Sequence, residues 1–521
     1  MNTKLLKQKI LDLAIRGKLT QQLKSDGTAA DLLKELADAK SALSQPKGKK
    51  SKKFAPISRI YCENGVWFEQ LENAKPKDIS EEIPFEIPEN WTWCRLECVC
   101  FDIADIDHKM PAVCDNGIPY ISPLNFVANN KIDFAGAKKI SKEDFLQLSK
   151  KCKPERGDII FPRYGTIGVI RTVETDIDFL VSYSCATIKP CKNHMDARFV
   201  SALLQSPLIQ EIEIPRYINK TTQANVGLQS IKKFLFALPP LAEQQRIVEK
   251  IQEAFAEIDS IEKNKELLKT HIKQARQKIL DLAIHGKLVP QNKTDEPASV
   301  LLERITRDNP HYEKIGLDER RETKDERSFK DKRHSREGGN LLAISKDEIP
   351  FDVPENWAWC RLGNILAPMQ SASPKGEFFK YIDIDAIDNS ICRIKSPKIV
   401  ESKKAPSRAS RFTKKDDILF SLVRPYLRNI AKVTENDCIA STGFFVCSPI
   451  IVNSDFCFYL LTSNYVVDGL NQFMKGDNSP SISSQNLVDF TIPLPPLNEQ
   501  SRIVAKIEEL FTELDSILQN I

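Results

Sequence analysis

The chain contains two copies of one pattern, and this internal duplication constrains its fold more than any other feature. Three blocks each occur twice in the same order, at offsets of 256, 269 and 266 positions. The blocks and their copies are 238–248 and 494–504, 8–15 and 277–284, and 83–91 and 349–357. The sequence between the blocks does not repeat. This arrangement predicts a bipartite protein in which two copies of one frame carry two different inserts.

The offsets also predict where the two chain ends belong. By the first offset Ile521 corresponds to position 265, and by the second Met1 corresponds to position 270. The segment from about 239 to 290 therefore has a second copy that is cut in two and placed at the two ends of the chain. If the copies fold alike, the termini lie close together and the molecule has a pseudo-two-fold internal repeat.

The repeated central segment has the apolar periodicity of a long helix. Apolar residues alternate at spacings of four and three, which is typical of a coiled coil. Pro239-Pro240 precedes the segment and Gly286 follows it, so we expect a helix from about 241 to 284, roughly 65 Å long. Its expected partner is the antiparallel split copy, and the alternative is an amphipathic helix on an ordinary core. The predicted coiled-coil positions are Ile247, Ile251, Ile258, Ile261, Leu268, Ile272, Ile279, Leu282, Ile503, Ile507, Leu510, Leu514 and Ile517.

Composition favours a multidomain cytoplasmic protein. A chain of 521 residues with 41% hydrophobic and 28% charged residues is too long for one core and is ordinary for a globular protein. The amphipathic N-terminus lacks the apolar region of a signal peptide, and no apolar run reaches the length of a membrane span. Thirteen scattered cysteines fit reduced thiols. Cys94, Cys98 and Cys100 cluster, but thiols on half-buried strands explain them better than zinc does.

Each non-repeated insert combines strand-like runs with a basic stretch. Short β-branched runs separated by Pro, Gly, Asn and Asp predict mixed α+β domains. From Arg393 to Lys432 twelve Lys and Arg face three acidic residues, and from Lys138 to Arg171 nine face four. One such stretch is ordinarily a solvated face, but one in each insert favours nucleic-acid binding.

The sequence lacks the motifs of the common catalytic sites. Gly17-Lys18 and Gly286-Lys287 are followed by Leu, so they form no phosphate-binding loop. Gly-x-Gly-x-x-Gly, His-Glu-x-x-His and Gly-x-Ser-x-Gly motifs are absent, as is the Asn-Pro-Pro-Tyr/Phe motif of amino-methyltransferases. We therefore expect no catalytic residues, no metal and no cofactor on this chain, although scattered acidic residues leave a nuclease site formally open.

The repeated blocks resemble those of the specificity (S) subunits of Type I restriction-modification systems. The resemblance rests on Leu-Pro-Pro-Leu-x-Glu-Gln-x-Arg-Ile-Val, Lys-Ile-Leu-Asp-Leu-Ala-Ile-x-Gly-Lys-Leu and Ile-Pro-Phe-x-x-Pro-Glu-Asn-Trp-x-Trp, each present twice. It implies two mixed α/β target recognition domains separated by a long antiparallel coiled coil. Each domain would read one half of an asymmetric, bipartite site in double-stranded DNA. Two methyltransferase (M) subunits and the restriction (R) subunits would be the partners, and S-adenosylmethionine, ATP and magnesium would belong to them.

With this resemblance the chain divides into seven parts. The predicted parts are an N-terminal helix at 1–45, a linker at 46–90, recognition domain 1 at 91–238, the central helix at 239–290, a charged and partly disordered linker at 291–356, recognition domain 2 at 357–493, and the C-terminal helix at 494–521.

The candidate DNA-binding residues lie in two kinds of loop and in the second basic stretch. One loop follows an apolar strand, and the other precedes each Pro-Pro helix, where the family tends to have small polar residues. Arg, Asn, Gln and Ser/Thr on loops suit base contacts, although a turn or a supporting hydrogen bond explains any single residue equally well. The candidates are Arg163, Tyr164, Thr166, Lys220, Thr221, Thr222, Gln223, Asn225, Lys404, Arg408, Arg411, Arg424, Tyr426, Arg428, Lys475, Asn478, Ser479 and Ser481.

Two other functions stay open at this point. A non-catalytic coiled-coil scaffold would explain the heptads but not the two dissimilar basic inserts. A stand-alone nuclease would cleave DNA with magnesium and no partner. An S subunit is expected to retain a DNA duplex in a sequence-specific way without cleaving it. A scaffold would not retain the duplex, and a nuclease would cleave it.

Overall fold

The computed structural model describes residues 2–44, 57–71, 74–106, 110–128, 130–219, 224–308 and 344–520. It divides into two compact units, Met1–Asn264 (unit 1) and Lys265–Ile521 (unit 2). The boundary falls close to the middle of the chain, as the duplication predicts. Each unit combines helices with small sheets, so the predicted α+β fold is confirmed.

The long central helix has the predicted bounds. Helix α7 (Leu241–Ile284) begins directly after Pro239-Pro240 and spans 44 residues. Two residues after its last residue lies Gly286, which has a φ of +66°, and Lys287 N–H donates to the Leu282 carbonyl at 2.9 Å. This is the Schellman arrangement that closes a helix with a left-handed glycine. A Cβ at Gly286 would lie 2.4 Å from Pro354 Cγ, so the position accepts only glycine.

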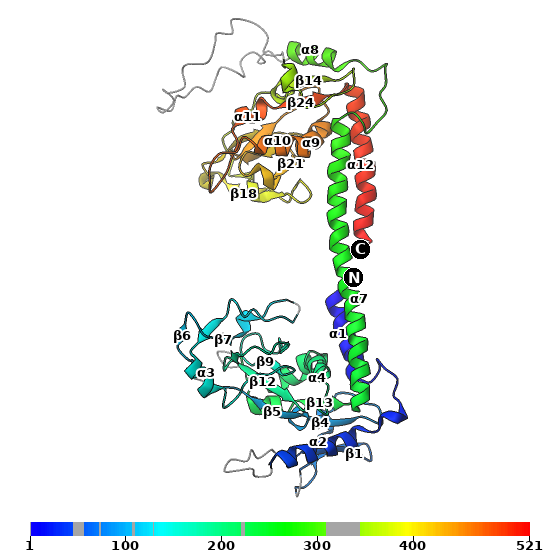
Figure 1. Ribbon diagram of the computed structural model, residues 1–521. Coiled ribbons are helices and arrows are strands. Elements are labelled where there is room, and N and C mark those ends of the chain that lie inside the picture. The colour runs from blue at the N-terminus through cyan, green and yellow to red at the C-terminus, as the bar shows by residue number, and fades with distance from the viewer. Residues whose placement is uncertain are drawn as a thin grey trace. The chain divides into compact units, whose positions relative to one another are not determined.

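In each unit one shorter helix runs antiparallel to α7 (Figure 1). Within unit 1, α1 (Thr3–Ile15) places Lys7 against Asp259 and over the Phe255 ring. Within unit 2, α12 (Leu497–Gln519) brings Asp515 to Arg276, whose guanidinium also lies over the Phe511 ring at 4.8 Å. The split copy thus supplies a partner helix in each unit.

Burial of the predicted coiled-coil positions is graded along the helices. The buried positions are Ile247, Ile251, Ile258, Ile272, Ile503 and Ile507, and the half-buried ones are Leu268, Ile279, Leu282, Leu510 and Leu514. Ile261 and Ile517 are instead 47% and 44% exposed. Thr3, at the start of α1, contacts Glu262, so Ile261 lies where the partner helix begins. Ile517 lies in the last turn of α12.

Unit 1 places its recognition region on two four-stranded sheets, in the orders β10-β9-β12-β5 and β11-β7-β8-β6. A separate pair, β13-β4, joins the region to α7. The strands are β4 (Thr92–Arg95), β5 (Cys100–Ala104), β6 (Val113–Cys114), β7 (Ile118–Ile121), β8 (Lys138–Ile140), β9 (Ile159–Pro162), β10 (Arg171–Thr172), β11 (Leu180–Val181), β12 (Cys185–Pro190) and β13 (Leu235–Leu238). The helical segments are η3 (Leu96–Val99), η4 (Pro123–Asn125), α3 (Lys142–Leu148), α4 (Ala197–Leu204), the π-helical η5 (Leu208–Glu213), α5 (Ile214–Tyr217) and α6 (Leu228–Lys232).

Unit 2 repeats this plan with different sheets, in the orders β18-β15-β22-β19, β21-β20-β23 and β16-β17, and with the pair β14-β24 in place of β13-β4. The strands are β14 (Ala358–Arg361), β15 (Phe378–Ile382), β16 (Ile387–Asp388), β17 (Arg393–Ile394), β18 (Lys398–Glu401), β19 (Ala409–Thr413), β20 (Ile418–Ser421), β21 (Ile430–Lys432), β22 (Cys438–Ser441), β23 (Phe444–Cys447) and β24 (Thr491–Leu494). The helical segments are η6 (Lys346–Glu348), η7 (Leu362–Ile365), η8 (Ile384–Ala386), η9 (Ser402–Lys404), η10 (Pro425–Leu427), α9 (Ser454–Thr462), α10 (Asn464–Asn471) and α11 (Ser484–Val488).

Two predicted boundaries need correction at the N-terminal end. The region 1–45 contains two helices, because α1 is followed by the short η1 (Lys24–Asp26) and then by α2 (Ala29–Ser44). The predicted linker 46–90 contains a three-stranded sheet of β1 (Arg59–Glu63), β2 (Val66–Gln70) and β3 (Lys77–Asp78), followed by η2 (Ser80–Glu82). Asn64 and Gly65, with φ of +50° and +80°, make the two-residue turn that joins β1 to β2. This Asn-Gly signal was overlooked.

The predicted charged linker 291–356 also contains a folded helix. Helix α8 (Ala298–Asp308) buries Leu301 and Ile305, and Ala298 N–H donates to the Asn356 carbonyl at 2.9 Å. In unit 1, Ala29 N–H at the start of α2 donates to Asn90 in the same way. Helix α8 is therefore the second copy of α2. Residues 309–343 of the predicted linker lie outside the described residues, so its predicted partial disorder stays a prediction. Within the described residues, no helix is both long enough and apolar enough to cross a membrane.

Candidate nucleic-acid interface

Two of the three repeated blocks meet at one junction in each unit, together with the segment that follows the third block. In unit 1 the carboxylate of Glu243, in the first turn of α7, accepts hydrogen bonds from Trp91 Nε1 at 2.9 Å and from Gln22 Nε2 at 2.9 Å. One turn further on, Arg246 forms an ion pair with Asp26. The junction fixes the base of the recognition region to the start of the long helix.

Unit 2 builds the same junction from the copied residues. Glu499 accepts from Trp357 Nε1 at 3.1 Å and from Gln291 Nε2 at 2.7 Å, and Arg502 pairs with Asp295 at 2.7 Å. Burial raises the pKa of Glu499, although the hydrogen bonds from Gln291 and Trp357 act in the opposite direction.

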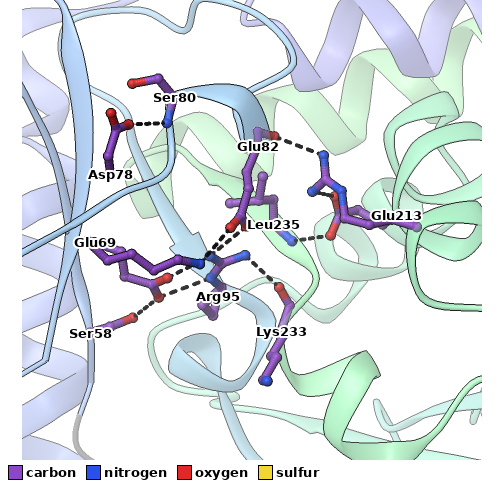
Figure 2. Close-up of polar contacts among 11 residues, drawn as sticks. Ser58, Glu69, Asp78, Ser80, Glu82, Arg95, Glu213, Lys233 and Leu235 are labelled. Atoms are coloured by element: carbon purple, nitrogen blue, oxygen red, sulfur yellow. Dashed lines mark hydrogen bonds and ion pairs between the residues drawn. The ribbon is translucent and has the colours of Figure 1, made fainter.

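A buried ionic cluster joins the β1–β3 sheet of unit 1 to the recognition region (Figure 2). Arg95, at the end of β4, donates to both oxygens of Glu69, at 3.0 and 2.6 Å, and to Glu82 at 2.9 Å. Burial is the largest influence on the pKa of each carboxyl and raises it. The hydrogen bonds and charge of Arg95, together with contributions from Ser58 and Lys77, outweigh burial and hold both pKa values below their usual range. The cluster makes the folded sheet an integral part of unit 1.

The two loops predicted to bind DNA pair with each other in unit 1. The loop after β9 carries Arg163, Tyr164 and Thr166, and the loop before α6 carries Asn225. Tyr164 and Asn225 form an antiparallel bridge, and Val226 N–H donates to the Arg163 carbonyl at 3.0 Å. Residues more than fifty positions apart thus form one paired-loop surface.

The equivalent loops also pair in unit 2. Val423 bridges Ser481, and Arg424 N–H donates to the Pro480 carbonyl at 2.8 Å. Arg424 and Arg428 both adopt left-handed backbone conformations, with φ of +48° and +56°. Such conformations are uncommon for residues other than glycine and often occur at functional sites. They bracket η10, whose Tyr426 is 45% exposed.

Most candidate side chains of the paired loops reach the surface. Thr166, Arg424, Tyr426, Lys475, Asn478 and Ser479 are exposed, and Tyr164, Asn225, Arg428 and Ser481 are half-buried. Lys220, Thr221, Thr222 and Gln223 lie outside the described residues. Arg428 donates to the Thr462 carbonyl and to Asn464, which fixes its position beneath the loop.

Arg163 needs a separate interpretation. Its guanidinium is buried, forms an ion pair with Asp105 at 2.5 Å and donates to the Tyr183 carbonyl at 3.0 Å. Asp105 lies 58 positions away, so the sequence gives no local sign of this pairing. These contacts favour a supporting role for Arg163 over the predicted base contact.

The basic stretches are partly neutralised by local ion pairs. In unit 2, Lys404 pairs with Glu401 at 2.9 Å, whereas Arg408 is exposed and Arg411 half-buried. Lys403, Lys414 and Lys415 are exposed and form no ion pair with any other described residue. In unit 1, Lys153 pairs with Asp178 and Arg156 with Asp176. The free positive charge is therefore smaller than the residue counts indicate, and it is larger in unit 2.

Cys94, Cys98 and Cys100 are buried thiols. Burial raises the pKa of Cys94, Cys98 and Cys100, which keeps them protonated. In the part of the chain that the structure describes, no three His, Cys, Asp or Glu side chains are grouped to hold a metal ion.

The junction residues were not identified as a site from the sequence. Trp91, Glu243 and their copies lie in the repeated blocks, which indicated the duplication and the family resemblance but were not used to predict a contact. Their repetition was itself the available signal, because polar residues at matching positions of two copies are expected to share a contact.

Comparison with known proteins gives consistent matches. Residues 89–270 and 354–521 match the family described as the Type I restriction modification DNA specificity domain. The chain is 24% identical to the Type I restriction enzyme EcoAI specificity subunit of Escherichia coli, over 97% of this chain and 88% of that protein. It is also 24% identical to the EcoEI specificity subunit of Escherichia coli, over 99% and 90%. A solved structure from a study of complex assembly and conformational transition of the type I R-M system shares the fold, with a TM-score of 0.50 and 20% identity over 84% of this chain and 94% of that one.

Proposed function

The chain belongs to the family of Type I restriction-modification DNA specificity domains, and on that premise we propose that it is the specificity subunit of such a system. Each unit would read one half of a split site in double-stranded DNA. The observation that carries this proposal is the paired-loop surface, which occurs at equivalent positions of both units with different residues. Two dissimilar readers imply an asymmetric site rather than a palindrome.

The spacing of the half-sites would be set by the helices. Two modules that read the major groove from one side of a duplex need centres about one helical turn or slightly more apart. A stiff antiparallel coiled coil of α7 with α1 and α12 can hold such a spacing, whereas a flexible linker cannot. The buried isoleucines of α7 and α12 support this arrangement.

The chemistry would belong to partner subunits. We propose that two methyltransferase subunits and the restriction subunits assemble on this chain in the cytoplasm. S-adenosylmethionine, ATP and magnesium would bind to those partners, while this chain binds and orients the DNA. A scaffold without sequence preference is the alternative, and a stand-alone nuclease is a weaker one.

Mapping N6-methyladenine across the host genome, with and without this gene, tests the proposal. Loss of one asymmetric, split methylated motif on deletion is the expected result, and it identifies both half-sites. A palindromic motif contradicts the asymmetric reading. If no motif changes, co-purification with a methyltransferase subunit and retention of duplex DNA decide between a silent system and a scaffold.

Arg424 is the sharpest single test of base reading. It is exposed on the paired loops, with its guanidinium donating to the Asn478 carbonyl at 2.8 Å. If it reads a guanine, Arg424→Ala should weaken binding of the mapped motif by about 1–3 kcal/mol. Arg424→Lys keeps the positive charge but cannot donate the two parallel hydrogen bonds of a guanidinium. It should therefore also reduce the preference for guanine at one base pair of the motif. Unchanged affinity and preference in both folded variants would remove Arg424 from the interface.

A further inference from the structure

Leu124 is the most exposed large apolar side chain among the described residues, at 95%. It lies on η4, directly after β7 of unit 1. A capping box fixes this turn: Ser122 N–H donates to Asn125 Oδ1 at 3.0 Å, and Asn125 N–H donates to the Ser122 carbonyl at 2.9 Å. A single exposed leucine is common on protein surfaces, so its setting must decide whether it has a role.

Arg171 holds the loop that carries Leu124. We call residues 122–128 the apex loop. The Arg171 guanidinium lies 4.9 Å from the Phe126 ring centroid and donates to the carbonyls of Val127 at 2.7 Å and Lys131 at 3.2 Å. These contacts use the donors of Arg171 within the protein. Arg171 therefore fixes the apex loop, and Leu124 is exposed on that loop.

The apex loop and the paired loops begin on two different sheets, which the segment 182–184 joins. Ile121, at the end of β7, accepts from Ser182 N–H at 2.8 Å, and Arg163, after β9, donates its N–H to the Ser184 carbonyl at 2.8 Å. The short segment 182–184 therefore contacts the origin of both loops. The apex loop therefore starts beside the paired loops of unit 1, within reach of a duplex bound on them.

We propose that Leu124 is an apolar wedge that contacts bases in the half-site read by unit 1. The inference rests on the proposed function. An apolar side chain acts as a wedge when it enters between two base steps and partly unstacks them. The exposed Lys131 and Lys138 nearby in sequence suit a polyanionic occupant. Because the loop is already ordered, binding would cost little conformational entropy.

Unit 2 has no matching wedge at the equivalent turn. The parallel pairs β7-β11 and β15-β22 correspond, with Ile121 opposite Val181 and Ile382 opposite Ala440. The turn after β15 is η8, where Asp385 is exposed and pairs with Lys398 at 2.7 Å. An acidic side chain there cannot act as an apolar wedge, so the inference applies to one half-site only.

The test compares three variants of the full chain, co-expressed with its methyltransferase partner, on a duplex that carries the mapped motif. Leu124→Ala should weaken specific binding about tenfold, the scale of burying one leucine side chain. Leu124→Met should bind nearly as the wild type. The matched control is Leu146→Ala on α3, which removes another leucine, 55% exposed, in the same recognition region and should change nothing.

Salt dependence and a base probe identify the contact. Leu124→Ala should leave the slope of log affinity against log salt unchanged, because an apolar contact releases no counterion. In the wild type, 2-aminopurine at one position of the first half-site should brighten on binding, and Leu124→Ala should abolish that change. If the Leu124→Ala and Leu146→Ala variants bind the motif with equal affinity, Leu124 is not a wedge. The proposal also fails if Leu124→Ala no longer co-purifies with the methyltransferase subunit but keeps its preference for the motif, because Leu124 would then contact that subunit. Failure of the wild type to prefer the motif overturns the proposed function, and the wedge with it.

Discussion

Arg95 in unit 1 and Arg361 in unit 2 occupy the same place in the repeat but have different surroundings. Each donates to the carbonyl before the second strand of its pair, Lys233 and Asp489 respectively, at 3.0 Å. Arg95 also holds two carboxylates and its side chain is 7% exposed, whereas Arg361 holds Glu348 and is 29% exposed. The duplication conserved the backbone contact, and the ionic contacts diverged.

The residues that pack beside these two arginines differ more strongly between the units. In unit 1 the buried carboxylate of Glu213 accepts from Leu235 N–H at 3.0 Å and pairs with Arg216. At the equivalent place in unit 2 is Gly469, where a Cβ would lie 2.6 Å from the Phe490 ring. Phe490 belongs to an aromatic group with Tyr465, Trp359 and Phe351. At this position unit 1 thus has a charged, hydrogen-bonded side chain, and unit 2 has a glycine against which the Phe490 ring packs.

Removing the two arginines should give the largest contrast. Arg95→Ala leaves the half-buried Glu69 without its ion-pair partner and Glu82 with only the exposed Lys77, at 3.1 Å. Breaking a buried ion pair from one side costs about 3–5 kcal/mol. Arg361→Ala should cost clearly less, because its partner Glu348 is exposed. Hydrogen exchange of peptides from each unit of the full chain measures the local free energy of opening.

The control for this pair is Arg59→Ala, which removes an exposed arginine from β1. It should leave exchange in both units unchanged. Equal losses for Arg95→Ala and Arg361→Ala would mean that the carbonyl contact, not the carboxylates, accounts for the stabilisation.

The junction glutamates provide the next contrast. Glu243 accepts from four side chains, including Thr20 at 3.2 Å and Asn90 at 3.4 Å, whereas Glu499 accepts from two. Glu243→Leu should destabilise unit 1 by about 2–4 kcal/mol, because each buried donor left unsatisfied costs about 1–3 kcal/mol. Glu499→Leu should cost less in unit 2. Urea unfolding followed by tryptophan fluorescence reports both, since Trp91 and Trp357 are the donors. A larger loss for Glu499→Leu would contradict this ranking.

Unit 1 has a titratable side chain, Glu213, at the position where unit 2 has Gly469, so only unit 1 should change in stability with pH through this position. Burial raises its pKa above the ordinary 4.5, against the effects of the Leu235 N–H and of Arg216. The folded state therefore binds the proton more tightly than the unfolded state does. The stabilisation from this group is complete below about pH 4.5 and is lost as pH rises through the folded pKa. Glutamine does not titrate, so Glu213→Gln should gain stability relative to the wild type as pH rises above about 5.

Unfolding of the full chain across this pH range measures the effect, with exchange in unit 1 as the local probe. Glu211→Gln, an exposed neighbour on η5, is the matched control and should follow the wild type. A parallel pH profile for Glu213→Gln and the wild type would show that Glu213 has the same pKa in the folded and unfolded states.

The sequence predicted features that depend on local pattern. The bounds of α7 followed from the heptads, Pro239-Pro240 and Gly286, and the two units followed from the duplication. The sequence also carried signals that were not used: Asn64-Gly65 for the β1–β2 hairpin, and the similarity of Leu32-Leu33 and Leu301-Leu302 for the α2 and α8 copies. Regions 46–90 and 291–356 were predicted to be linkers from their composition, although these local signals indicate folded elements within them.

Features that depend on distant partners could not be predicted. The burial of Arg163 depends on Asp105, and the pairing of the two loops in each unit depends on how the sheets are assembled. A basic residue after a strand looks the same in sequence whether it faces DNA or an internal carboxylate. Base-reading side chains therefore have to be assigned from exposure, and the target bases from experiment.

The smallest predicted contrast concerns the last turn of the copied helices. Arg16, after α1, lies over the Phe85 ring at 4.2 Å and donates to Asp12 at 2.7 Å. At the same place His285, after α7, stacks on Phe351 with ring centroids 3.9 Å apart and lies 3.3 Å from Asp281. Arg16→His should destabilise unit 1 by about 0.5–1 kcal/mol through the lost cation–π contact. His285→Arg should keep unit 2 within about 0.5 kcal/mol of the wild type, because the exchanged side chain gains a cation–π contact as it loses the stacked one. Hydrogen exchange near Gly17 and Gly286 resolves differences of this size. If both substitutions destabilise equally, each side chain is adapted to its own neighbours, and the two copies have diverged even where their sequences still align.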